Sequence, residues 1–66
     1  MIHTRWGNHV QKILAVARDE IGTPVFVKAL RDDNETRWYP IYELRADDGI
    51  HEILEACEGM PQEAHA

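Results

Sequence analysis

The sequence has little of what disulfide, metal or membrane chemistry requires. Its single cysteine, Cys57, excludes a disulfide within the chain and gives no sign of an oxidising compartment, so we expect a cytoplasmic protein. The four histidines are scattered, and neither an H-x3-H nor a C-x2-C spacing occurs, so neither a metal nor another cofactor is expected. No apolar run approaches the length of a membrane span, and no apolar signal region stands at the N-terminus, so no membrane contact is predicted.

Residues that could carry out catalysis are also few. Cys57 belongs to an apolar helical pattern and is predicted to be a buried core thiol, since the nearby glutamates would raise its pKa and disfavour the thiolate. The aspartate pairs at 32–33 and 47–48 occupy a turn and a helix start, where aspartate is common for structural reasons. The sequence contains no glycine-rich phosphate-binding loop. We therefore predict that the protein is not an enzyme.

Charge is distributed unevenly along the chain. The formal net charge is −5, yet all seven lysines and arginines lie within residues 1–45. Residues 46–66 contain six acidic residues and no lysine or arginine. Binding to nucleic acid depends on clustered basic residues, so the acidic C-terminal segment opposes that function, while the nearly neutral remainder leaves it open.

Three segments have the composition of β-strands. Residues 10–18 alternate and become continuously apolar in the middle; a helix is the alternative, but β-branched residues and the turn that follows favour a strand. Residues 25–30 form a second apolar run, and residues 38–44 form a third that contains most of the aromatic surface. Pro40 lies inside the third run, which predicts an edge strand or a bend, because proline cannot donate to the ladder.

The segment after residue 46 predicts an amphipathic helix over residues 50–57. Asp47 or Asp48 is expected to act as its N-cap, and Gly59 is expected to end it. The helix surface carries one apolar stripe at helical spacing, wide enough to cover one face of a sheet. The stripe consists of Ile50, Ile53, Leu54 and Cys57.

These elements predict a mainly β or α+β domain. The expected fold is a three-stranded, antiparallel, curled sheet, an incomplete SH3-like barrel, capped by one C-terminal helix. Residues 1–8 are expected to form an N-terminal arm, residues 9–59 the domain, and residues 60–66 a flexible tail. Trp38 is expected to lie in the core.

The order and spacing of short motifs over residues 9–58 carry a resemblance to a known family. Residues 10–14 read VQKIL, residues 25–28 read VFVK, and residues 38–44 read WYPIYEL, with a glycine-containing turn and an acidic turn between them. This pattern resembles chromodomains and chromo-shadow domains. The resemblance implies an incomplete SH3-like barrel closed by a helix. It also implies protein–protein contact, either through a helix-mediated homodimer or through an added peptide strand.

The chromodomain aromatic cage for methyl-lysine is not matched. The three cage positions correspond to Asn8, to Ala29 and to Arg31 or Asp32, none of which is aromatic. Trp38 matches the tryptophan that belongs to the family's core. The resemblance therefore favours members that use the fold for contact with other proteins.

The function predicted from the sequence is that of a non-catalytic protein–protein interaction module of chromo-like fold that can also self-associate. Two alternatives remain open. The domain could bind nucleic acid through a basic, aromatic strand face that includes Arg31, Arg37 and Arg45. Alternatively, the acidic helix could mimic DNA towards a nucleic-acid-binding protein through a solvent-facing row of Glu52, Glu55 and Glu58. The residues predicted to contact a partner are Trp6, Tyr39, Tyr42, Arg37, Glu52 and Glu55.

Overall fold

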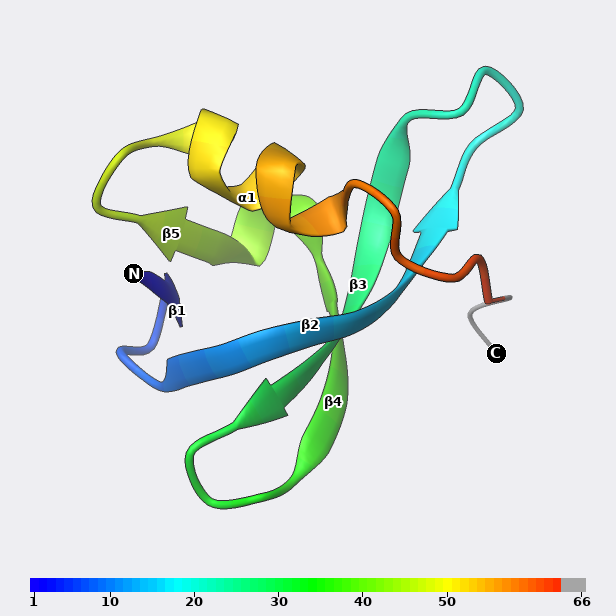
Figure 1. Ribbon diagram of the computed structural model, residues 1–66. Helices are drawn as coiled ribbons and strands as arrows, with labels where there is room; N and C mark the ends of the chain where they lie inside the picture. The colour runs from blue at the N-terminus through cyan, green and yellow to red at the C-terminus, as the bar shows by residue number, and fades with distance from the viewer. Residues whose placement is uncertain (64–66) are drawn as a thin grey trace.

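In a computed structural model that describes residues 1–63, the chain forms one antiparallel sheet of five strands and a C-terminal helix (Figure 1). The strand order is β4-β3-β2-β1-β5, so β4 and β5 are the two edges of a sheet that does not close. The class is therefore mainly β. Along the chain the elements are β1 (Ile2–Thr4), β2 (His9–Arg18), β3 (Pro24–Arg31), β4 (Thr36–Pro40), the 3₁₀ helix η1 (Ile41–Glu43), β5 (Leu44–Ala46) and α1 (Ile50–Cys57).

Two short strands were not predicted from the sequence. The expected third strand over residues 38–44 is interrupted, because Pro40 ends β4 and the chain turns through η1 before β5 begins. The expected arm over residues 1–8 contains β1, which pairs with β2 on one side and with β5 on the other. The predicted sheet of three strands is thus too small. Part of the expected N-terminal arm, Ile2–Thr4, is a strand of the observed sheet.

Strand β2 causes the sheet to curl. Its pairing with β3 shifts register between Val10 and Lys12, between Ile13 and Ala15, and again near the end of the strand. Bulges of this kind bend a strand and increase its twist. The curled sheet therefore surrounds a core to which β2, β3, β4 and β5 all contribute, and α1 packs against β5, β2 and β3.

The core aromatic is Tyr39 and not Trp38, which corrects two expectations. Tyr39 is 6% exposed and pairs across the sheet with the buried Val27. Trp38 is half-buried and pairs with Lys28. Because neighbouring residues of a strand point to opposite faces, only one of the two aromatics can enter the core.

Helix α1 has the predicted bounds but a different N-terminus. Its N-cap is Gly49, at a φ of 83°, and neither Asp47 nor Asp48 caps it with a side chain. The Asp48 backbone N–H donates to Glu52 Oε1 at 3.3 Å, so the first turn is joined to the preceding loop by a glutamate that reaches back. Gly59 has a positive φ of 74° just beyond the last turn, as expected for the end of a helix.

Part of the expected flexible tail pairs with β2. The Val16 backbone N–H donates to the Pro61 carbonyl at 3.0 Å, and the Glu63 N–H donates to the Val16 carbonyl at 2.9 Å. Lys28 Nζ lies 3.6 Å from Glu63 Oε1. The prediction of a frayed tail is therefore corrected for residues 61–63, and residues 64–66 lie outside the described residues.

Among residues 1–63, no helix combines the length and hydrophobicity needed to cross a bilayer.

Candidate functional site

One edge of β2 is only partly covered. On the side away from β3, strand β1 pairs with His9 and Val10, and Gln62 forms a parallel bridge with Val16. Residues 11–15 lie between these two contacts, and nothing in the described part of the chain pairs with them as a strand on this side. The backbone groups on such an edge can accept an added strand.

A groove of about 430 Å³ lies beside residues 9–13 of this edge. In Figure 1, α1 passes above β2, with β1 near one end of β2 and the C-terminal segment near the other. Glu52, Ala56 and Met60 follow one another at intervals of four residues and face the groove from the helix side. The remaining lining consists of Met1, Ile2, His9, Val10, Gln11, Lys12 and Ile13.

Charges in this groove, which we call the β2 groove, are mostly neutralised within the chain. The amino group of Met1 lies 2.5 Å from Glu52 Oε2 and 3.8 Å from Asp47 Oδ2. The hydrogen bond from this amino group lowers the pKa of Glu52, and the same bond raises the pKa of the amine. Lys12 has no ion-pair partner within residues 1–63, so it is the one uncompensated charge along the β2 groove.

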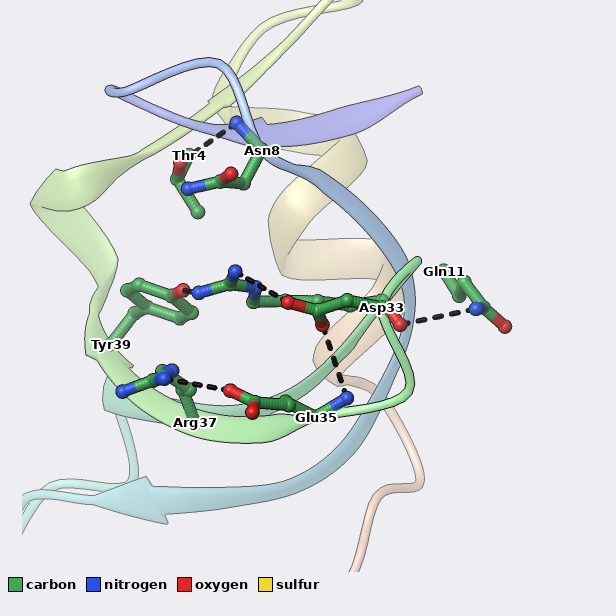
Figure 2. Close-up of polar contacts among 8 residues, drawn as sticks. Thr4, Asn8, Gln11, Asp33, Glu35, Arg37 and Tyr39 are labelled. Carbon is green, nitrogen blue, oxygen red and sulfur yellow. Dashed lines mark hydrogen bonds and ion pairs between the residues drawn. The ribbon is translucent and has the colours of Figure 1, made fainter.

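The predicted residues Trp6 and Tyr39 meet at one corner of the domain, which we call the Trp6 corner. Their ring centroids are 6.5 Å apart at an interplanar angle of 40°, and the Arg5 guanidinium lies 5.5 Å from the Trp6 ring centroid. The buried Thr4 hydroxyl holds the turn that carries Trp6, because it accepts from the backbone N–H of Trp6 at 3.3 Å. It also accepts from the backbone N–H of Asn8 at 3.2 Å (Figure 2). Trp6 is exposed, whereas Tyr39 is buried and was wrongly expected at the surface.

Basic residues near this corner are paired with acidic ones. Arg31 donates to Asp33 Oδ2 at 2.7 Å and to the Tyr39 hydroxyl at 3.4 Å. Arg37 donates to Glu35 Oε2 at 2.7 Å (Figure 2). A backbone N–H from Glu35, followed by the Arg31 charge, lowers the pKa of Asp33 and keeps it ionised. These ion pairs neutralise two of the three arginines of the predicted basic strand face, whereas the third, Arg45, has no ion-pair partner within residues 1–63.

The other predicted contact residues do not join this corner. Tyr42 projects from η1 into a separate apolar hollow. Glu55 is exposed on α1, but Glu52 is half-buried and bound by the Met1 amine, so the predicted solvent-facing row of Glu52, Glu55 and Glu58 is broken at its first member. The six predicted residues thus lie in at least three places.

The β2 groove was not found from the sequence. Its distinguishing feature is a stretch of unpaired backbone, and backbone groups are the same for every residue. Only the shortness of β1 exposes them, and a strand of three residues has no readable period. Ala56 and Met60 gave no signal, because they lie outside the predicted apolar stripe.

The described residues contain no group of three or more histidine, cysteine, aspartate or glutamate side chains placed to hold a metal ion. Comparisons with protein-family models, with curated protein sequences and with solved structures gave no significant match. A functional proposal therefore depends on the geometry of this chain.

Peptides that contain trimethyl-lysine are expected not to bind at about millimolar concentration. The Trp6–Tyr39 corner offers only two rings, one of them buried, and the Arg5 guanidinium over Trp6 would repel a second cation. Binding of the peptide is measured by an NMR titration that follows the Trp6 indole signal. Saturable shifts that disappear in Trp6→Ala would show that the corner works as a cage.

Proposed function

We propose that this chain is a non-catalytic protein-interaction module that binds an extended segment of a partner protein as an added strand in the β2 groove. The observation that carries the proposal is the open edge of β2 at residues 11–15, between β1 and residues 61–63. We further propose that the fold is a chromo-like, incomplete SH3-like barrel. The pairing of β1 with both β2 and β5 supports this assignment.

The chain already uses part of this edge in the proposed way. Residues 61–63 run parallel to β2 and exchange two backbone hydrogen bonds with Val16. The edge of β2 at Val16 therefore already pairs with an extended segment. The unpaired part is residues 11–15, of which Gln11 and Lys12 are exposed, whereas Ile13 and Ala15 are 5% and 0% exposed. An added strand is therefore expected to pair first with the backbone of Gln11 and Lys12.

The side-chain chemistry of the β2 groove suits strand addition. Backbone hydrogen bonds from such an edge supply affinity for any sequence, and pockets for alternate side chains supply specificity. Ile2, Ile13, Ala56 and Met60 offer apolar surface to the side chains of the added strand that point inward. Because ordering a flexible segment offsets much of this gain, we expect a dissociation constant in about the micromolar range.

Substituting Ala56 by arginine is expected to weaken binding at least about tenfold, because the longer side chain occupies the β2 groove. Ala56 is half-buried on the groove side of α1, and arginine is a good helix former. His51→Arg, an exposed position outside the β2 groove, is the matched control and should change affinity less than about twofold. The measurement is a calorimetric titration with a peptide selected on the folded protein from a random display library.

NMR of the labelled protein provides the second readout. The selected peptide is expected to shift the amide signals of residues 11–15 and to protect some of them from exchange. Equal binding by wild type and Ala56→Arg, or shifts confined to the Trp6 corner, would contradict the proposal. Capture of nucleic acid alone from a lysate, lost on nuclease treatment, would favour the basic strand face instead.

The two alternative functions have less support. Nucleic-acid binding through the strand face is disfavoured because Arg31 and Arg37 already face Asp33 and Glu35. DNA mimicry by the helix is disfavoured because the Glu52 carboxylate is neutralised by the Met1 amine.

A further inference from the structure

A second hollow in the protein surface is separate from the β2 groove. It has a volume of about 660 Å³ and lies where the start of β3, the end of β4, η1, β5 and the first residue of α1 meet. Tyr42 lines it, so we call it the Tyr42 hollow. The Tyr42 hollow and the β2 groove have no lining residue in common. An occupant of this hollow is therefore independent of the partner segment proposed for the β2 groove.

The Tyr42 hollow is open and almost wholly apolar. Seven of its nine lining residues have hydrocarbon side chains. Leu44 is 3% exposed and is the most deeply buried of the nine, whereas Tyr42, Ile50 and Val25 are 74%, 48% and 37% exposed. A concave apolar surface of this volume, with a few polar groups at fixed places, is typical of a site for a small molecule.

The two polar side chains of the Tyr42 hollow, the Arg45 guanidinium and the Tyr42 hydroxyl, can both donate a hydrogen bond. Arg45 Nη1 donates to the backbone carbonyls of Tyr42 at 2.7 Å and of Leu44 at 2.9 Å, which satisfies these acceptors and positions the guanidinium. Within residues 1–63, neither Nε nor Nη2 of Arg45 donates to another group, and Arg45 forms no ion pair. The edge formed by Nε and Nη2 matches the two oxygens of a carboxylate.

The backbone around the Tyr42 hollow is poorly suited to a peptide. Pro24 begins β3 and Pro40 ends β4, and neither has a backbone N–H group. An extended chain laid across the hollow finds no donor at these two positions, so strand addition of the kind proposed for the β2 groove is disfavoured here. A small molecule needs no backbone donors, because apolar contact and one ion pair can hold it.

We propose that the Tyr42 hollow binds a small apolar carboxylic acid of about 6–12 carbons. The hydrocarbon part of the ligand, a ring or a branched chain, packs against Tyr42, Ile50 and the buried Leu44. Its carboxylate accepts two hydrogen bonds, from Nε and from Nη2 of Arg45. The charge determines the class of ligand, because a neutral or cationic molecule of the same shape leaves the guanidinium without a partner.

Phenylbutanoate, phenylbutanol and phenylbutylamine form a matched set of probes, because they share one hydrocarbon skeleton and differ in charge. NMR titrations of the labelled protein are expected to give a dissociation constant of about 0.1–1 mM for the acid. The alcohol is expected to bind about threefold to tenfold more weakly, since the ion pair is exposed to solvent, and the amine more weakly still. The acid is expected to shift the amide signals of Tyr42, Arg45 and Ile50 but not those of residues 11–13.

Substitutions separate the charge from the apolar contact. Arg45→Gln is expected to weaken binding of the acid about threefold to tenfold and to leave binding of the alcohol unchanged. Arg5→Gln, at an exposed position outside the Tyr42 hollow, is the matched control and should change neither. Tyr42→Ser is expected to weaken both probes, because it removes the ring from the hollow. Circular dichroism of each variant confirms that it is folded.

The proposal is overturned if the acid and the alcohol bind wild type equally, or if Arg45→Gln and Arg5→Gln weaken binding of the acid to the same extent. Absence of saturable shifts at Tyr42 and Ile50 up to about 10 mM acid also overturns it. A short peptide that ends in phenylalanine with a free carboxylate is the last comparison. If this peptide binds at least about tenfold more tightly than phenylbutanoate, the occupant is the C-terminus of a protein and not a small acid.

Discussion

Replacing Tyr39 by alanine is expected to leave most of the protein unfolded. Tyr39 is buried in the core, and its hydroxyl accepts a hydrogen bond from Arg31. Removing a buried aromatic side chain costs about 3–5 kcal/mol. A domain of 66 residues has a free energy of unfolding of about 3–10 kcal/mol, so the cost of this substitution is comparable with the total stability. Urea unfolding followed by circular dichroism measures the change.

The adjacent Trp38 supplies the control for this experiment. It lies on the opposite face of β4, half-buried beside Lys28, and Trp38→Ala is expected to cost only about 1–2 kcal/mol. If Trp38→Ala lowers the free energy of unfolding more than Tyr39→Ala does, then Trp38 and not Tyr39 lies on the core face of β4.

The Cys57 thiol is expected to react with a disulfide reagent at least about a hundredfold more slowly in the folded protein than in urea. Cys57 is almost completely buried, and burial raises its pKa above the ordinary value of 9.0, although the nearby Arg18 partly opposes this. Burial keeps the reagent away from the thiol, and the raised pKa lowers the fraction of the reactive thiolate. The measurement compares pseudo-first-order labelling rates at one pH. Labelling at the same rate in both states would show that Cys57 is accessible.

The same pKa shift has a consequence for stability at high pH. The folded-state pKa of Cys57 lies above its unfolded value, so folding favours the neutral thiol. This contribution is fully present below the unfolded pKa and is lost as the pH rises through the folded pKa. Urea midpoints are therefore expected to fall above about pH 9 in wild type and to fall less in Cys57→Ala.

The longest elements could be predicted from the sequence alone. Strand β2 and helix α1 have enough residues to show a period, and α1 begins and ends at the predicted residues. Strands β1 and β5 have three residues each and depend on tertiary pairing, since β1 pairs with both β2 and β5, and β5 pairs with β1. The choice between Trp38 and Tyr39 as the core residue could not be made, because a shift of one residue exchanges the two faces of a strand.

The candidate sites depend on relationships that the linear pattern does not contain. The β2 groove exists because β1 is too short to cover its neighbour. Ile50 and Leu54 remain exposed because the sheet covers only half of the predicted apolar stripe. Tyr42 was predicted as a contact residue from its aromatic character, but its place beside Ile50 follows from η1, which the sequence did not indicate. Glu52 was predicted to face solvent, and its pairing with Met1 joins residues at opposite ends of the chain.

The pairing of β1 with β5 also determines when the protein can fold. Ile2 lies opposite Val10 on one side and Ala46 on the other, so β1 has a nearby partner in β2 and a distant partner in β5. The β2–β3–β4 meander can form earlier, because its turns are local. Contacts between distant parts of a chain slow folding, which for sheets of this kind takes about milliseconds to seconds. Strand β1 can therefore pair with β2 early, whereas its pairing with β5 must follow, and the core closes only when residues from Leu44 to Cys57 join it.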